Sequence, residues 1–530
     1  MKKKIFSLSL LSLLISGCQG AINLRFVPID KYIEEHNYVI DYEDEHFIRY
    51  SKSNSVTTDI GEINNISNLL ENNKTGRKRE TLLSKGDINL LVVPVYFTDS
   101  DISLLEKKTI FIENAFFGDH KMTNYDSVAG YYNKSSYGTL RIKGEVAPWY
   151  NIGVDSSNWK SISSSYMNAS SIIAEKAIDK IKEDKSITLS KYDLDNDNNI
   201  DGVYLIYDHP YVSSNNKSNE DNLFWAYTYY TYQGENGYNN EAPYLNNYSW
   251  TSVETIIQKD NRSYTNYLIH ETGHLLGLSD YYNTHYIYDD YGGRDYHYQP
   301  LGLFDMMDYN IGDHSAFSKY LLNWSSPLVV KEGVNFKYKL KPFISSGDYL
   351  LIPSKKYNNS PFSEYLLVEY FIPEVLNRFS GQFSYMDKNG NKGIYTYPEY
   401  HGLKIYHVNA TLGYYTLGSI NSSLLATVDD PNYKEKIEGK SVALDYAYNN
   451  SINDEQANKD YPVLYHLLES SGSNTFKDSI PSNNNTLFRL GDDFGITTFK
   501  DFTFNDGSKA NFTLKVEAIS TKEITISITR

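Results

Sequence analysis

The sequence contains a single cysteine, Cys18, among its 530 residues. One cysteine excludes a disulfide within the chain, and a chain of this length can bury enough apolar surface to fold without one. Basic residues are also scarce, because 50 lysines and arginines stand against 66 aspartates and glutamates, for a formal net charge of −16. Such an acidic protein is repelled by nucleic acids, so the composition argues against nucleic-acid binding.

A membrane-spanning run is missing from the N-terminus, where the apolar stretch 5–15 is too short to cross a bilayer. The stretch instead follows three lysines, as in a signal peptide, and leads to Ile15-Ser16-Gly17-Cys18. These four residues match a lipobox, where bacterial lipoprotein signals are cut and the cysteine is lipidated. Residues 1–18 therefore predict export and a lipid anchor (palmitate) at Cys18, on the cell surface or the outer face of a membrane. The alternative is a plain cleaved signal with an incidental cysteine.

The most informative segment is His-Glu-Thr-Gly-His-Leu-Leu-Gly-Leu-Ser-Asp at 270–280. On a helix, His270 and His274 project from the same face one turn apart. Two imidazoles so placed suit Zn²⁺, and Asp280 can supply a third, oxygen ligand, which leaves one position open for water, as in a catalytic zinc site. Glu271 stands beside the first ligand, where it can take a proton from that water. Gly277 lets the chain leave the helix, because glycine tolerates a positive φ.

The alternative for this segment is an ordinary amphipathic helix with two surface histidines. Residues 264–269 and the pair Leu275-Leu276 make the helix apolar on most sides, which predicts burial. Two buried histidines and a glutamate need polar or metal partners. The zinc interpretation is therefore favoured over the amphipathic one.

A second element lies downstream, in Gly302-Leu303-Phe304-Asp305-Met306-Met307-Asp308-Tyr309-Asn310. Zinc peptidases with an extended HExxHxxGxx(H/D) motif place a methionine-bearing turn beneath the metal. Met307 is the predicted turn residue, and the phenol of Tyr309 can reach the metal or a developing oxyanion. The alternative is that both methionines are plain core residues.

These motifs resemble the immune-inhibitor-A-type secreted metallopeptidases of bacteria, which are metzincin-like zinc endopeptidases. The resemblance extends in order along the chain, from about residue 88 to 410, through the segments 117–118, 127–132, 135–138, 280–282, 305–307, 318–324 and 402–408. It implies a zinc endopeptidase with His270 and His274 as ligands and Glu271 as general base. Asp280 stands where many metzincins have histidine, and Asp is usual in this family; a carboxylate from elsewhere in the chain is the alternative.

A second candidate metal site precedes the zinc helix, in the acidic stretch 193–202. Asp193, Asp195, Asp197 and Asp201 can turn their oxygens toward one point, and Ca²⁺ prefers six to eight oxygen ligands. The stretch is not a full EF-hand, because Asn198 replaces the turn glycine. A partial calcium loop with a structural role is favoured over a solvated acidic turn, in which four close carboxylates would repel one another. The family resemblance also implies calcium.

Periodicity predicts an α+β fold: a zincin-like (metzincin-like) catalytic domain at 87–328, with a twisted sheet and an active-site helix, then an all-β sandwich at 329–530. Residues 19–86 are polar and are interpreted as either a propeptide or a tether, with the basic cluster 74–79 as a point of cleavage that would release the enzyme into the medium. The expected strands are 88–97, 203–207, 349–352, 365–370, 403–408, 512–516 and 524–528, the expected helices are 102–117 and 170–183, and Asn389-Gly390 marks a hairpin.

The sequence thus predicts a monomeric, exported zinc endopeptidase that hydrolyses proteins or peptides with one zinc ion. Two rival functions are kept. One is a surface-binding or adhesion lipoprotein on an inactive peptidase fold, which the presence of the ligands, the base and the Met turn argues against. The other is a zinc hydrolase of a non-peptide bond.

Overall fold

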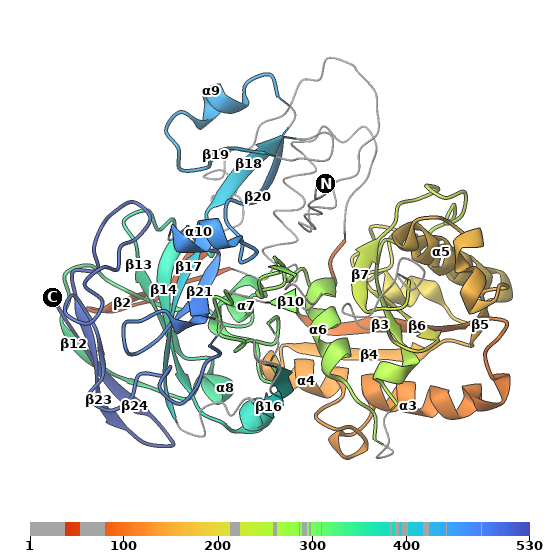
Figure 1. Cartoon of the computed structure of the whole chain (residues 1–530), viewed down its shortest axis with the longest axis horizontal. Coiled ribbons are helices and arrows are strands. Elements are labelled where there is room, and N and C mark those ends of the chain that lie inside the picture. Colours follow the sequence, from red (N-terminus) through yellow and green to blue (C-terminus); the bar gives the residue numbers. More distant parts are fainter. Residues whose placement is uncertain are drawn as a thin grey trace. The chain divides into compact units, whose positions relative to one another are not determined.

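The computed structural model describes residues 38–52, 80–212, 223–257, 262–285, 287–288, 294–295, 298–308, 310–380, 384–386, 392–394, 401–416, 423–440, 442–459, 461–478 and 480–530. Helices and several sheets mix in these residues, so the predicted α+β class is confirmed. The chain divides into two compact units (Figure 1). We call them the helix-rich unit, described between 80 and 279, and the strand-rich unit, described at 38–52 and from 280 onward. No helix in the described part of the chain is both long and apolar enough to cross a membrane.

The helix-rich unit is built on a six-stranded sheet. Its main order is β4-β3-β6-β8-β7, with β5 also paired to β3, and only the edge strand β7 runs antiparallel to its neighbour. The central strand β3 is a nearly continuous apolar run, as expected of a parallel strand that is covered on both faces. The strands are β3 (Gly86–Tyr96), β4 (Leu140–Val146), β5 (Tyr150–Asn151), β6 (Val203–Asp208), β7 (Tyr227–Tyr230) and β8 (Asn247–Ser252).

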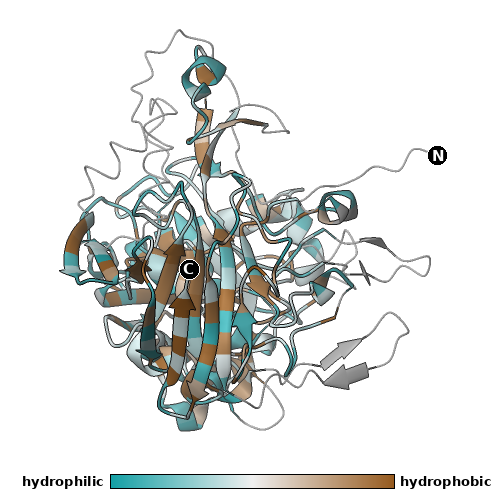
Figure 2. Ribbon diagram, turned by 90° about the vertical axis from the view of Figure 1, so that its left-hand side faces the viewer, coloured by the Kyte–Doolittle hydropathy of each residue, from teal (hydrophilic) through white to brown (hydrophobic). Residues whose placement is uncertain are grey.

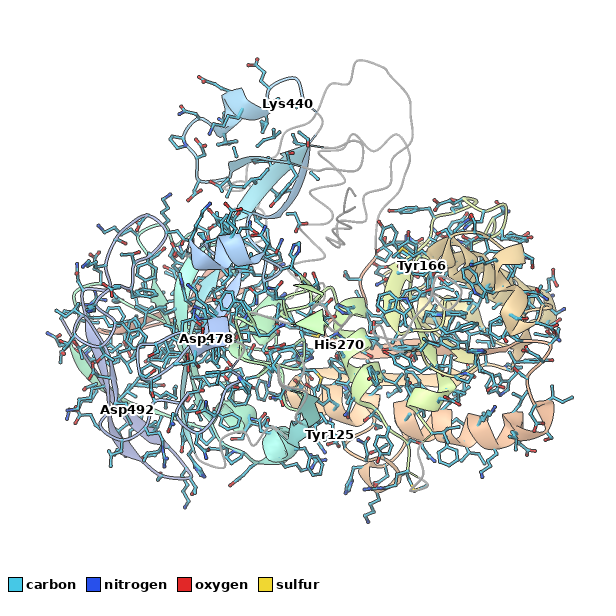
Figure 3. All side chains as sticks on the ribbon, in the orientation of Figure 1. Tyr125, Tyr166, His270, Lys440, Asp478 and Asp492 are labelled. Carbon is cyan, nitrogen blue, oxygen red and sulfur yellow. The ribbon has the colours of Figure 1, made fainter. Side chains whose placement is uncertain are left out.

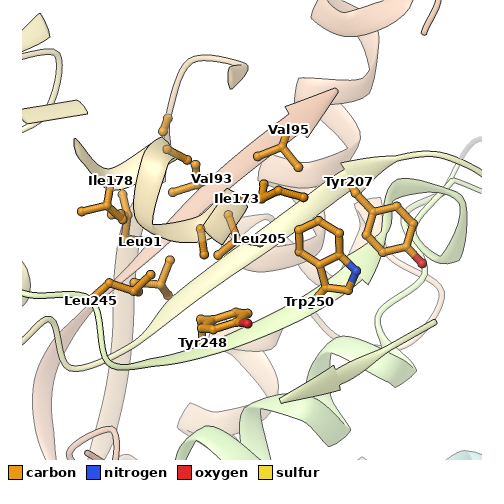
Figure 4. Packing of buried hydrophobic residues seen from close by; sticks show 14 of the residues in the cluster. Leu91, Val93, Val95, Ile173, Ile178, Leu205, Tyr207, Leu245, Tyr248 and Trp250 are labelled. Carbon is orange, nitrogen blue, oxygen red and sulfur yellow. The ribbon is translucent and has the colours of Figure 1, made fainter. Parts of the chain in front are cut away.

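Helices cover both faces of this sheet. Residues of α5, including Ile173 and Ile178, pack with Leu91, Val93 and Leu205 in one buried apolar cluster (Figure 4). On the opposite face, α4 contacts both α3 and α6, α3 and α4 contact β4, and α6 contacts β7 and β8. The unit contains α3 (Leu105–Phe117), α4 (Val128–Ser135), α5 (Tyr166–Asp184) and α6 (Asn266–Leu275), with short 3-10 turns η1 (Ile102–Leu104), η2 (His120–Met122), η3 (Ser156–Ser161), η4 (Leu189–Tyr192) and η5 (Val253–Thr255).

The strand-rich unit contains a seven-stranded sheet of order β1-β2-β11-β13-β14-β17-β21 and a four-stranded sheet of order β12-β24-β23-β22. Strands β12 and β23 alternate buried and more exposed residues, so that one face of each is buried, whereas β14 is buried along its whole length; Figure 2 shows the hydropathy from the side of this unit. The seven strands are β1 (Tyr38–Glu43), β2 (Phe47–Lys52), β11 (Leu328–Val330), β13 (Tyr349–Pro353), β14 (Glu364–Phe371), β17 (Gly402–Asn409) and β21 (Tyr465–Leu468), and the four are β12 (Phe336–Leu340), β22 (Asp493–Phe494), β23 (Thr513–Ile519) and β24 (Ile524–Thr529).

Smaller elements complete the strand-rich unit. Strands β18, β19 and β20 form a three-stranded sheet, and β9 with β10 and β15 with β16 form two-stranded ones. These strands are β9 (Ile287–Tyr288), β10 (Arg294–Asp295), β15 (Ser384–Met386), β16 (Lys392–Ile394), β18 (Leu412–Thr416), β19 (Leu424–Thr427) and β20 (Val442–Tyr446). The helices and 3-10 turns are α7 (Ala316–Leu321), α8 (Phe343–Ser346), α9 (Tyr433–Ile437), α10 (Asp454–Asn458), η6 (Val375–Phe379) and η7 (Thr475–Asp478).

All seven strands and both helices expected from periodicity are present, with boundaries shifted by a few residues. The helix expected at 102–117 begins as η1 and continues as α3. On α5, Ile173, Ala177, Ile178 and Ile181 are buried, whereas Ile172 is half-buried. Strands β15 and β16 pair antiparallel on either side of Asn389-Gly390, although those two residues lie outside the described part of the chain.

Part of the segment interpreted as a propeptide or tether is a β-hairpin. Strands β1 and β2 pair antiparallel, and β2 continues into the seven-stranded sheet because Phe47 and Ile48 pair with Val330 and Val329 of β11. The hairpin therefore forms the edge of that sheet, about 280 positions away in sequence from its partner strand. Cys18, the signal 1–18 and the basic cluster 74–79 lie outside the described residues.

Candidate metal centre

Helix α6 carries the predicted metal ligands and is fixed against the sheet by two buried tyrosines. Tyr204, on β6, donates its hydroxyl to the Leu268 carbonyl at 2.6 Å. Tyr132, on α4, donates its hydroxyl to the Ile269 carbonyl at 2.7 Å. Burial raises the pKa of both phenols well above the usual value, so each keeps the proton that it donates. The helix thus has a defined position relative to the strands.

The helix ends as the sequence predicts, at Gly277. This glycine has a φ of 98°, in the left-handed region, and its N–H donates to the His274 carbonyl at 3.0 Å. The next N–H, of Leu278, donates to the Gly273 carbonyl at 2.9 Å. These two bonds are those of a Schellman motif, which reverses the chain after a helix. The reversal also places the Leu278 carbonyl 2.8 Å from Nδ1 of His274.

His270, His274 and Asp280 converge. Each offers a ligand atom, these atoms lie within 4.8 Å of one another, and all three residues are half-buried (His270 is labelled in Figure 3). The bond to the Leu278 carbonyl accounts for one ring nitrogen of His274: because a carbonyl only accepts, Nδ1 carries the hydrogen and Nε2 keeps its lone pair. Two imidazoles and one carboxylate fit the donor set of a catalytic zinc.

Glu271 lies on the same helix, between the two histidines in sequence, and is only 5% exposed. Its Oε2 accepts a hydrogen bond at 2.9 Å from Oγ1 of Thr228, on the edge strand β7. A buried carboxylate beside two imidazoles that could hold a metal is a candidate general base. Thr228 was not predicted from the sequence, because nothing in an isolated threonine indicates a contact with a residue 43 positions away.

The predicted Met turn is a tight, buried turn organised by Asp305. Met307 is fully buried, its N–H donates to Asp305 Oδ1 at 2.8 Å, and the N–H of Ser315 donates to Oδ2 of the same aspartate at 3.1 Å. Burial raises the pKa of Asp305 to about 6. The Met307 carbonyl accepts from the N–H of Tyr281, the residue next to Asp280, at 2.8 Å. Tyr309 lies outside the described residues.

The acidic loop 193–202 is closed by its own carboxylates. Asp193 accepts hydrogen bonds from the N–H groups of Asp197 and Asn198 at 3.0 and 3.2 Å, and Asp201 accepts from the N–H of Leu194 at 3.1 Å. Asn198 has a φ of 73°, the left-handed conformation that asparagine tolerates in place of the glycine of full EF-hands. Burial, with Asp195, Asp193 and Asp197 close by, raises the pKa of Asp201 to about 7.

The carboxylates that this loop brings together include one from outside it. Glu80, Asp195 and Asp197 have oxygens within 4.8 Å of one another, while Asp193 and Asp201 do not belong to that group among the described residues. Glu80 is 6% exposed, and its N–H donates to Asn246 Oδ1 at 2.9 Å. Sequence reasoning missed Glu80, since it lies 115 positions before Asp195 and at the end of a polar segment without any motif.

Comparison with known families agrees with this geometry. A family model described as the immune inhibitor A peptidase M6 catalytic domain matches residues 95–297, a stretch that contains His270, Glu271, His274 and Asp280. The acidic loop also lies within the match, whereas Glu80 and Met307 lie outside it. None of the curated proteins compared with the chain matches it.

Proposed function

We propose that the chain is a metallopeptidase and, more specifically, a zinc endopeptidase acting on proteins outside the cytoplasm. The similarity of residues 95–297 to the immune inhibitor A peptidase M6 catalytic domain supports this proposal. One observation carries the proposal: the ligand atoms of His270, His274 and Asp280 lie within 4.8 Å of one another, with buried Glu271 on the same helix. Three protein ligands leave a position for water, which distinguishes a catalytic zinc from a structural one. In this proposal the helix-rich unit has a zincin-like fold, and α6 is its active-site helix.

The proposed mechanism assigns one task to each residue. His270, His274 and Asp280 hold the metal, and a bound zinc ion would lower the pKa of a water molecule and polarise the scissile carbonyl. Glu271 takes a proton from the attacking water and returns it to the leaving amine nitrogen, so that the carboxylate is regenerated. Tyr309 is proposed to donate a hydrogen bond to the developing oxyanion. Met307 is proposed as the structural residue of a Met turn.

We also propose where the enzyme acts. The signal 1–18 and its lipobox support export and lipidation of Cys18, which would hold the protein at a membrane surface that faces away from the cytoplasm. Cleavage within the basic cluster 74–79 would separate the lipid anchor from the helix-rich unit. We propose that the protein acts as a monomer on protein or peptide substrates.

The test of the zinc endopeptidase is an assay of residues 19–530 on denatured casein, with the zinc content measured in parallel. We expect one zinc per chain, cleavage at internal peptide bonds, loss of cleavage after chelation, and recovery on adding zinc. Protein that binds no zinc would overturn the proposal in favour of a binding lipoprotein on a peptidase fold. Bound zinc without cleavage of casein or of a mixed peptide library would favour hydrolysis of a non-peptide bond.

We further propose that a structural calcium ion binds at the acidic loop, held by Glu80, Asp195 and Asp197, with Asp193 and Asp201 shaping the loop around it. The support is the close approach of three carboxylates, one of them buried, which are hard oxygen donors of the kind Ca²⁺ prefers. The role is stability, because such a cation would join the loop before β6 to the residues that precede β3.

Calcium is expected to raise the melting temperature of the protein in a concentration-dependent way. At a calcium concentration of a hundred times the Kd, the free energy of unfolding should rise by about 2.7 kcal/mol. Glu80→Gln should weaken the effect, whereas Glu113→Gln, an exposed glutamate on α3, should not. The measurement is thermal unfolding against calcium concentration. Equal calcium responses of wild type and Glu80→Gln would contradict the assignment of Glu80.

The calcium effect should depend on pH through Asp201. Its pKa is about 7 in the folded protein and 3.8 ordinarily, so below neutral pH a proton opposes cation binding at the loop. Calcium should therefore stabilise the protein more at about pH 8 than at about pH 6. Without calcium the trend reverses: the folded state binds a proton that the unfolded chain releases, and the contribution of Asp201 to stability is lost as the pH rises from about 4 to about 7. Asp201→Asn should reduce both trends.

A further inference from the structure

We propose that Thr228 is a positioning residue for Glu271 and that Ser249 orients the hydroxyl of Thr228, so that two side chains from neighbouring strands set the geometry of the general base. The inference rests on the proposed function, in which Glu271 is that base. Thr228 is on the antiparallel edge strand β7, and it pairs directly with Ser249 of β8. Their hydroxyl oxygens are 2.7 Å apart.

The direction of this hydrogen-bond chain follows from counting protons. Thr228 has one hydroxyl hydrogen, and Oε2 of the ionised Glu271, at 2.9 Å, only accepts. Thr228 therefore donates to Glu271, and the contact with Ser249 must be a bond in which Ser249 donates. The Glu271 carbonyl is farther from the same hydroxyl, at 3.3 Å, and is the weaker of the two acceptors. A hydrogen bond to an ionised acceptor is stronger than one between neutral groups.

This arrangement has a consequence for the base. The terminal torsion of a glutamate is broad, so a carboxylate without a fixed partner samples many orientations. With Oε2 held by Thr228, the plane of the carboxylate is set, and Oε1 is the oxygen that takes the proton from water. Misplacement of a catalytic group by about 1 Å can cost 10²-fold in rate. Because Glu271 is not among the three proposed metal ligands, its orientation should affect turnover rather than metal binding.

The same strand region supplies a matched control. Thr231, just after β7, is buried. Like Thr228, it donates its hydroxyl to a buried carboxylate, in this case that of Glu175 on α5. Glu175 has no part in the proposed chemistry. Thr231→Val therefore removes the same type of hydrogen bond from the same sheet edge without touching Glu271.

The experiment compares Thr228→Val, Thr228→Ser and Thr231→Val in the zinc-loaded protein on a defined peptide taken from the casein digest. Thr228→Val should lower kcat by about 10–100-fold, with KM and the zinc stoichiometry almost unchanged. Thr228→Ser keeps the hydroxyl and should restore most of kcat. Thr231→Val should lower stability and leave kcat at the wild-type value. Zinc affinity, measured by competition with a chelator, provides a readout that is independent of turnover.

Two further variants separate the possible failures. Ser249→Ala removes the hydrogen bond that Ser249 donates to Thr228, and it should lower kcat by less than Thr228→Val does. The inference is overturned if Thr228→Val or Ser249→Ala folds, binds zinc and keeps the wild-type kcat. If Glu271→Gln is inactive in that same assay, the proposed function stands and only the positioning role is lost. If Glu271→Gln retains wild-type kcat, the base assignment fails, and the inference fails with it.

Discussion

Glu271→Gln is expected to lower kcat by about 10²–10⁴-fold while one zinc ion per chain remains bound, because general-base catalysis contributes a factor of this size. Glutamine has nearly the same shape, and its amide oxygen can still accept from Thr228, so the surroundings of α6 stay intact. What the substitution removes is the ability to take a proton from water. His270, His274 and Asp280 are unchanged, so metal binding should be preserved.

The comparison that gives this result its meaning is with His274→Ala. That variant removes a proposed metal ligand, the imidazole whose Nδ1 faces the Leu278 carbonyl, and it should lose zinc and activity together. Zinc content by elemental analysis and kcat on one peptide distinguish the two classes of variant. Glu271→Gln that keeps zinc and cleaves as fast as wild type would exclude Glu271 as the base. Glu271→Gln that loses zinc would instead identify it as a residue required for metal binding.

The sequence predicted the parts of the site that are local. His270, His274 and Asp280 fall within eleven positions, and helical spacing with one glycine is enough to bring them together. The strands and helices with strong periodicity were predicted for the same reason, since a pattern of buried residues is recorded in the segment itself. In the acidic loop the hydrogen bonds accepted by Asp193 and Asp201 are also local, but the left-handed conformation of Asn198 was not predicted.

The contacts that could not be predicted are those between distant segments. Thr228 reaches Glu271 only because β7 is the edge strand beside β8, and Glu80 reaches the acidic loop only because it precedes β3 in the folded unit. A single sequence records neither adjacency. The hairpin at 38–52 was missed for a related reason: its residues are largely exposed or half-buried, so little periodicity marks them, and pairing with β11 is what places β2 in the sheet.

Breaking the buried ion pair between Lys319 and Asp313 is expected to be among the most destabilising changes in the strand-rich unit. Lys319, on α7, is completely buried, and its Nζ lies 2.5 Å from Oδ2 of Asp313, which is itself almost entirely buried. Burial lowers the pKa of Lys319, and the neighbouring Asp313 opposes this effect. The ammonium also lies 4.8 Å from the centre of the Phe343 ring, and the charges of Glu369 and Asp305 favour its protonated form as well.

Asp313→Ala should therefore lower the free energy of unfolding by about 3–5 kcal/mol, because the buried ammonium loses the carboxylate with which it is directly paired. The double variant Asp313→Leu with Lys319→Met should lose much less, since it removes both charges and roughly conserves volume. Urea denaturation of Asp313→Leu, Lys319→Met and the double variant gives the coupling energy between the two residues. If the double variant loses as much stability as the two single variants together, the ion pair contributes nothing beyond packing.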